Sequence, residues 1–526
     1  MAMEMSSQNQ EFIDWKGQKA NPKKHGGSIA ASFACVVEVL ENMVFLSNAI
    51  NFIAYFISSM NYSPADAANM VTNFMGTSFL LTIFGGFISD SFLTRFWTFI
   101  IFCSIELLGL ILLTVQAECP KLQPAMHKRP SQSQAAVLFI GLYAMATGVG
   151  GVKASLPAHG ADQLNHGNQK HISSFFSWFF FSLCTGGLIS ATVMVWIEDN
   201  KGWNWSFKLS LIALSFALCI FISGFPIYRY KLPAGSPLTR IFKVFASTFR
   251  NWKASPAMVH NTEETNLDSI SDGRPNNKFR FLNKALSDGS VSAVEVEETK
   301  TILGLLPIFA TTIMMNCCLA QLQTFSVEQG NIMNRKLKHF KIPTQSLSVL
   351  PLTFMLVSIP CYEHFVKIFW KKSQGGYTIF QPLKRIGLGL ALASGSMAVA
   401  AVVEAKRRNA AIYSGATISV FWLAWQYLLL GISDMLTLGG TLEFFYSQAP
   451  DRMRSSCTAL SWCSTSMGFF FSSLLVTISD KVSGQFGKAW LEAEDLNHNR
   501  LDLFYTLLCV LNLLNFLNYI YWAKRY

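Results

Sequence analysis

The sequence predicts an all-α membrane protein with twelve transmembrane helices in two six-helix halves. Of the 526 residues, 51% are hydrophobic and only 14% are charged, whereas soluble domains carry roughly 25% charged residues. Apolar segments of about 20 residues, the length that crosses a hydrocarbon core of about 30 Å as a helix, recur along the chain. One polar segment separates these apolar segments six and six, a layout typical of transporters built from two repeated halves.

The first half of the chain begins with a polar tail, residues 1–27, which we expect in the cytosol. No short apolar core precedes a cleavage site there, so the first apolar segment is interpreted as a retained span. The N-terminal six-helix half, 28–228, is predicted to have spans at about 31–57, 70–89, 97–116, 135–157, 173–197 and 207–228.

A connector, residues 229–300, follows the sixth span and is expected on the cytosolic side. Its segment 236–252 places apolar residues at helical spacing with Arg and Lys on another face, which predicts an amphipathic helix on the membrane surface. Its middle, TEETNLDSISDGRPNN, is polar and is expected to be mobile. The C-terminal six-helix half, 301–526, is predicted to have spans at about 301–327, 346–370, 384–403, 417–446, 457–479 and 502–523.

Composition excludes several classes of function. The net charge of +11 would suit nucleic acid in a soluble protein, but in a membrane protein it more often reflects loops beside anionic lipid. The eleven cysteines are scattered and form no CxxC metal pair. No nucleophile–base constellation, phosphate-binding loop or metal-ligand cluster is evident, so we expect neither an enzyme nor a cofactor.

Charged residues inside apolar spans are the main functional signal, because a charge at the bilayer centre costs about 2.5–3.5 kcal/mol on insertion scales. Glu38 and Glu41 are three residues apart and share a helical face. They would repel each other unless one is protonated or a cation lies nearby, which suits a proton site. Lys153 is the natural partner of either glutamate, or of Asp434 in the second half, where the pair would latch the halves together. Glu106 has no evident partner; we expect it near a membrane face, in a local structural role.

The segment GGFISDSFLTRF, residues 85–96, joins the second and third spans. Asp90 and Arg95 would clasp neighbouring helices on the inner side. If the motif stood alone, ordinary turn residues at a membrane surface would be the better interpretation.

Five segments together resemble one family, the proton-coupled oligopeptide transporter family of the major facilitator superfamily, in its plant nitrate/peptide branch. GGFISDSFLTR resembles the loop signature of the superfamily, and EVLEN resembles the ExxER motif of the first span. GVGGVKASLPAHGADQ, FFSWFFFSLCTGG and GISDMLTLGGTLEFFYSQAPDRMRS resemble the family's fourth-, fifth- and tenth-span segments. The segment LLPIFATTIMMNCCLAQLQTFSVEQ is similar in sequence to members of the subfamily that contains abscisic acid and gibberellin importers.

The resemblance implies roles for individual residues. Glu38 and Glu41 match the proton-coupling glutamates, Lys153 matches the fourth-span lysine, and Asp434 matches a tenth-span position usually held by Glu. Asn42 departs from the family, which has Arg there. A neutral amide in place of a guanidinium makes the local field less positive, so the glutamates should accept protons more easily.

Two further positions follow from the resemblance to a nitrate carrier. Leu319 stands where that carrier has a nitrate-contacting His, so nitrate recognition by that route is absent. Thr98 matches a regulatory phosphorylation position, and a regulatory kinase would be its partner.

The sequence as a whole therefore predicts a proton-coupled importer of a small organic anion, working by alternating access. The expected substrate is a carboxylated plant hormone, abscisic acid or gibberellin, whose carboxylate Lys153 would attract. The alternatives are low-affinity nitrate transport and a membrane sensor that binds a ligand without transporting it. The resemblance implies a multi-pass location in the plasma membrane, with protons, the anionic substrate and the bilayer as partners and no nucleic acid.

Overall fold

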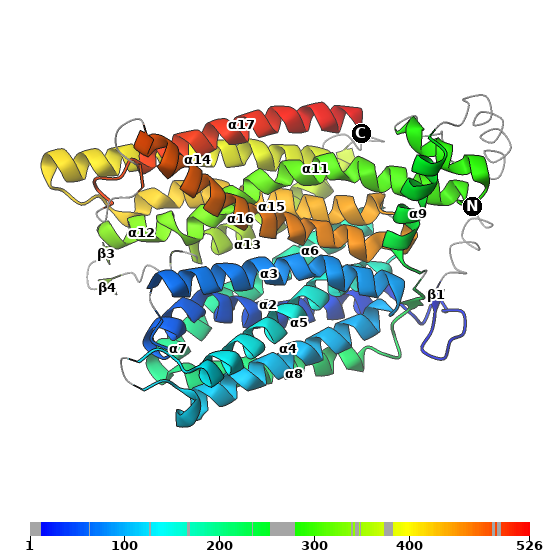
Figure 1. Ribbon diagram of the computed structural model, residues 1–526, viewed down its shortest axis with the longest axis horizontal. Coiled ribbons are helices and arrows are strands. Elements are labelled where there is room, and N and C mark those ends of the chain that lie inside the picture. The colour runs from blue at the N-terminus through cyan, green and yellow to red at the C-terminus, as the bar shows by residue number, and fades with distance from the viewer. Residues whose placement is uncertain are drawn as a thin grey trace.

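The computed structural model describes residues 12–62, 64–125, 128–165, 169–233, 235–252, 279–337, 340–341, 347, 349–372, 382–485, 490–491 and 496–526. The described part is a bundle of long helices that run side by side along the longest axis of the molecule (Figure 1). The polar middle of the connector, which we expected to be mobile, lies outside the described residues, as do the first 11 residues of the tail.

The elements of the first half lie between residues 12 and 231. Their bounds are β1 Phe12–Ile13, α2 Gly27–Ser58, α3 Pro64–Ser91, α4 Arg95–Glu118, η1 Pro120–Leu122, α5 Gln132–Asp162, α6 Gln169–Ile189, η2 Ser190–Met194, α7 Val195–Lys201, α8 Trp203–Ser223 and β2 Tyr230–Lys231. The predicted fifth span is thus α6 and α7 joined through η2, a π-helical turn. Strands β1 and β2 pair antiparallel, Phe12 with Lys231 and Ile13 with Tyr230.

The second half of the bundle follows the connector elements α9 Pro237–Arg250 and η3 Arg280–Asp288. Its elements are α11 Ala293–Gln323, α12 Phe325–Ile332, β3 Lys336–Leu337, β4 Phe340–Lys341, α13 Val349–Lys372, α14 Pro382–Ser414, η5 Val420–Trp422, α15 Leu423–Gln448, η6 Asp451–Met453, α16 Arg454–Gln485 and α17 Leu501–Arg525. Strands β3 and β4 pair antiparallel.

The predicted twelve-span architecture is confirmed. Eleven stretches of the described helices are long and apolar enough to cross a membrane, and α13, with a shorter described apolar stretch at Val349–Phe365, occupies the place of the eighth predicted span. Helix α11 begins eight residues before the predicted span because a capping box starts it early. The Ser292 hydroxyl accepts from the backbone N–H of Glu295, whose side chain accepts from the Ser292 N–H.

Glycines allow α4 and α5 to pack closely inside the first half. A Cβ added to Gly148 would lie 2.4 Å from the Cβ of Glu106, and one added to Gly151 would meet the Phe102 ring. Small residues at such positions let two membrane helices approach each other. This close approach sets how near the side chains of α4 lie to those of α5.

The two halves meet along α3 and α16, which lie next to each other in the bundle (Figure 1). The end of the bundle that carries β1, α9 and the last turn of α17 is called the termini end here; it is on the right in Figure 1. Helices α2 and α4 begin at this end, and α5 finishes there.

The connector helix α9 has two different faces. Val244 is buried against Leu282 and Ala285 of η3, whereas Leu238, Phe242 and Phe249 are exposed. The amphipathic helix predicted at 236–252 is therefore present, one residue shorter at its start and two at its end. Its position on a membrane surface stays a prediction.

Candidate functional site

Two helices bring the predicted acidic residues and the lysine together. Glu38 and Glu41 share a face of α2, and Lys153 lies on α5; all three side chains are at most 1% exposed. The Lys153 Nζ donates to Glu38 Oε1 at 2.8 Å and to Glu41 Oε2 at 2.5 Å. The cation that the paired glutamates require is thus supplied by the same half of the protein. We call these three residues the acidic site.

Asn42 ties the acidic site to a third helix. Its Oδ1 accepts a third hydrogen bond from Lys153 Nζ at 3.0 Å, and its Nδ2 donates to the Leu183 carbonyl oxygen on α6 at 2.7 Å. A guanidinium at this position would lack the acceptor oxygen that holds Lys153. Where the resemblance leads us to expect an arginine, Asn42 thus supplies a hydrogen-bond acceptor for Lys153 instead of a second positive charge.

The acidic site has more acid than base. Two carboxylates against one ammonium leave one negative charge if both acids are ionised. Glu38 Oε2 and Glu41 Oε1 have no hydrogen-bond partner among the described residues. Buried polar atoms are normally hydrogen-bonded, so these two oxygens are the natural places for a proton to bind.

Aromatic rings from both halves surround Lys153. Its Nζ lies 5.8 Å from the centroid of the Phe45 ring and 5.5 Å from that of the Trp462 ring. Trp462, on α16, stacks on Phe79 of α3 with centroids 5.6 Å apart and planes within 4°. The Trp462 Nε1 is buried and has no acceptor among the described residues. A side chain of the second half thus borders the charged site of the first.

Asp434 lies apart from the acidic site. It is on α15, its side chain is buried, and Cys184 of α6 is a neighbour within electrostatic range. Within the described part of the chain it makes no hydrogen bond or ion pair. The Lys153–Asp434 latch, one of the two pairings that the sequence allows, is not formed in this arrangement.

Asp90 and Arg95 flank the turn between α3 and α4 and are buried, not surface turn residues. Asp90 accepts from the backbone N–H groups of Ser455 and Ser456, at 3.2 and 2.7 Å, and from the Ser456 hydroxyl at 2.8 Å. These N–H groups belong to the first turn of α16, where a carboxylate is favoured by the unpaired donors and the helix dipole. Asp90 therefore caps a helix of the opposite half.

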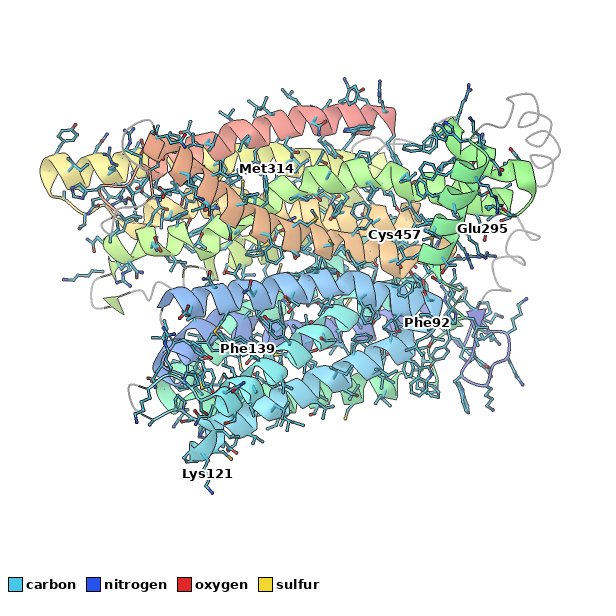
Figure 2. All side chains as sticks on the ribbon, viewed as in Figure 1. Phe92, Lys121, Phe139, Glu295, Met314 and Cys457 are labelled. Atoms are coloured by element: carbon cyan, nitrogen blue, oxygen red, sulfur yellow. The ribbon has the colours of Figure 1, made fainter. Side chains whose placement is uncertain are left out.

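Arg95 extends this contact to two more helices. It lies 3.5 Å from Asp90, donates from Nε to the Ser455 hydroxyl at 2.7 Å, and forms an ion pair with Asp162 at the end of α5. Asp162 also accepts from the Tyr446 hydroxyl of α15 at 2.7 Å. We call Asp90, Arg95, Asp162 and Tyr446 the clasp. Figure 2 places Phe92, in the turn beside it, and Cys457, near the start of α16, toward the termini end.

The two positions taken from the nitrate carrier are not part of the acidic site. Leu319 is partly buried against the apolar core of the second half. Thr98 is completely buried, and its hydroxyl donates to the Thr94 carbonyl oxygen at 3.1 Å. A kinase would have to displace this part of α4 to reach the Thr98 hydroxyl.

Sequence reasoning missed Asp162, Tyr446 and Trp462 as members of these sites. Asp162 and Tyr446 lie inside two of the segments that carry the family resemblance. The position of Asp162, an acid at the end of a predicted span, was the signal that could have identified it. Trp462 gave no signal, since an aromatic residue in an apolar span is usually a packing residue.

Comparison with known proteins identifies the family. The family model described as POT family matches residues 96–491. Two Arabidopsis thaliana proteins, NRT1/ PTR FAMILY 4.2 and NRT1/ PTR FAMILY 4.1, are 57% and 56% identical to this chain over 518 residues, covering 98% of the chain and 99% of each relative. The chain belongs to the POT family.

Solved structures of POT proteins share the fold of this POT protein. An auto inhibited POT family peptide transporter aligns with a TM-score of 0.67 at 19% identity, over 95% of this chain and 97% of the other. A POT family transporter in complex with 5-aminolevulinic acid aligns with a TM-score of 0.61 at 13% identity, over 92% and 94%. The protein is therefore a multi-pass membrane transporter with the major facilitator fold, and its family members are transporters rather than enzymes.

Proposed function

We propose that this POT protein is a proton-coupled secondary transporter that imports a small organic anion by alternating access. The proposed substrate is a carboxylated plant hormone, abscisic acid or a gibberellin, taken up across the plasma membrane. The observation that carries the proposal is the acidic site, in which one buried ammonium is held by two carboxylates with proton-accepting oxygens to spare.

Coupling follows from competition for the Lys153 ammonium. While Glu38 and Glu41 are ionised, both hold the ammonium, and a substrate carboxylate would have to displace a carboxylate. A proton that binds either glutamate removes a negative charge and weakens that hold, because hydrogen bonds between charged groups are about twice as strong as neutral ones. The ammonium then attracts the substrate anion, so proton and substrate binding favour each other.

The surroundings of Lys153 favour an organic anion with an apolar body. The rings of Phe45 and Trp462 provide apolar surface next to the ammonium, and Phe79 extends it by stacking on Trp462. The Trp462 N–H is a donor without an acceptor among the described residues. A carboxylate could accept from both Lys153 and Trp462, while the rest of the molecule packs against rings. A small hydrated oxyanion would leave those rings unused.

Alternating access requires the halves to separate at one end at a time. The clasp joins the halves at the termini end through Asp90, Arg95, Asp162 and Tyr446, so the present arrangement is closed there. We propose that this end faces the cytosol and opens when the clasp breaks. Asp434, buried without a partner among the described residues, is proposed as the acid that receives Lys153 or a proton after that change.

Known complexes of the fold are consistent with both an organic and an inorganic anion. A POT transporter has been solved with 5-aminolevulinic acid, a small amino acid, and its carboxylate supports an organic carboxylate as the substrate. Another has been solved with sulfate, an inorganic oxyanion, which favours low-affinity nitrate uptake as the second candidate.

The test is uptake by oocytes that express the full chain. Labelled abscisic acid, a labelled gibberellin and labelled nitrate are supplied separately at acidic and at neutral external pH. We expect hormone uptake to exceed nitrate uptake and to rise as external pH falls. Uptake independent of pH would refute proton coupling, and a higher nitrate uptake would favour the second candidate. Binding without accumulation would instead indicate a sensor.

A further inference from the structure

A third acid lies beside the acidic site. Glu106 is midway along α4, between Arg95 and Glu118, and its side chain is completely buried. This contradicts the expectation that it lies near a membrane face. Neither of its carboxyl oxygens has a hydrogen-bond partner among the described residues.

Glu106 lies at nearly the same depth as the acidic site. It is eleven residues from the start of α4, Glu38 is eleven residues from the start of α2, and Lys153 is nine residues from the end of α5. All three helix ends are at the termini end, and eleven residues of α-helix span about 16 Å. Gly148 allows α4 to approach α5 at Glu106 itself, so Glu106 lies directly against the helix that carries Lys153.

The charged and titratable neighbours of Glu106 are the members of the acidic site and one thiol. Among the described residues, Glu41, Lys153 and Glu38 lie within electrostatic range of its carboxyl group. On its own helix, Cys103 interacts with Glu106. No second cation is among these neighbours, and Lys153 already donates to Glu38, Glu41 and Asn42.

An ionised Glu106 would be unfavourable here for two reasons. A buried charge without a hydrogen bond or a direct counter-ion loses its hydration and gains nothing in return. It would also bring three carboxylates against one ammonium, and like charges in one buried site cannot all ionise. The neutral acid avoids both costs.

We propose that Glu106 is a third proton-binding carboxyl of the acidic site, which holds a proton while Lys153 is bound to the α2 glutamates and exchanges that proton with Glu41. In the exchange, the O–H bond on Glu106 breaks and an O–H bond forms on Glu41. The proton stays in the site, and two carboxylates remain beside Lys153, now Glu38 on α2 and Glu106 on α4 instead of both glutamates on α2. The inference rests on the proposed proton coupling and adds a place where a proton is kept inside the membrane.

Infrared spectroscopy of the purified full-length protein in lipid membranes tests the proposal without any substrate. A protonated carboxyl has a C=O stretching band separate from those of ionised carboxylates and of the backbone. We expect Glu106→Gln to remove one such band at neutral pH and Glu106→Asp to shift it. The matched control is Glu118→Gln on the same helix, at an exposed acid paired with Lys208, which should leave the band unchanged.

The second measurement asks whether the proton exchanges with the site. Raising the pH should abolish the Glu106 band, and Glu41→Gln should lower the pH at which this happens, because one like charge is gone. If Glu106→Gln removes no band, Glu106 is ionised and the proposal is wrong. If the band exists but responds neither to pH nor to Glu41→Gln, Glu106 is a static structural acid and the proposal is equally wrong. Neither result depends on uptake, so failure here is distinct from failure of the proposed transport function.

Discussion

Removing the Lys153 ammonium should convert the acidic site from a stabilising contact into an uncompensated pair of buried charges. Lys153 donates to two carboxylates and one amide oxygen, and all of these groups are buried. Breaking a buried ion pair by removal of one partner costs about 3–5 kcal/mol. We therefore expect Lys153→Ala to lower the free energy of unfolding by about that amount at neutral pH.

The way in which the stability of Lys153→Ala changes with pH tests the argument more strictly than the size of the loss. In the variant, Glu38 and Glu41 lack a cation, so their ionisation opposes folding; acid pH neutralises them and should restore part of the lost stability. In the unaltered protein Lys153 already compensates part of this charge, so the gain in stability at acid pH should be smaller than in the variant. Unfolding is followed by heating the purified full-length proteins across a pH series.

A matched control uses a lysine in an exposed pair. Lys208 contacts Glu118, and both side chains are at least 40% exposed, so Lys208→Ala should cost no more than about 1 kcal/mol at any pH. Equal stability of Lys153→Ala and the unaltered protein would refute the argument. A loss of the same size at every pH would also refute it, since that would reflect lost packing rather than charge.

Three other substitutions probe separate parts of the site. Asp434→Asn should abolish substrate accumulation with little change in thermal stability, because the carboxyl has no bonded partner among the described residues; normal accumulation would exclude the proposed role. Asn42→Arg adds a fixed positive charge that favours ionised glutamates, so the rise in uptake should move to lower external pH, and an unchanged pH profile would mean that this position only packs. Gly148→Ala places a methyl group 2.4 Å from a carbon of α4 and should reduce the yield of folded protein. Gly395→Ala, at a helical glycine with no neighbouring atom within 4 Å, is its control and should be neutral or slightly stabilising.

The sequence motif that contains Asp90 and Arg95 predicted contacts between helices but did not identify the partner residues. GGFISDSFLTRF suggested that Asp90 and Arg95 hold neighbouring helices, but the same residues suit an ordinary surface turn. Only the position of α16 distinguishes these alternatives, because Asp90 caps N–H groups 365 and 366 residues further along the chain. No local pattern in the sequence encodes that distance.

The sequence by itself determined the elements and the contacts within one helix. The length of apolar segments sets the number of spans, because the thickness of a bilayer requires about 20 residues per helix, and a spacing of three puts Glu38 and Glu41 on one face. The tertiary structure alone decided which acid Lys153 pairs with, that Asp434 stays apart, and that Glu106 borders the acidic site. Those outcomes depend on how separate helices are shifted and rotated against one another. The packing of the helices follows from close approaches such as that at Gly148 and from contacts between side chains that are far apart in the chain.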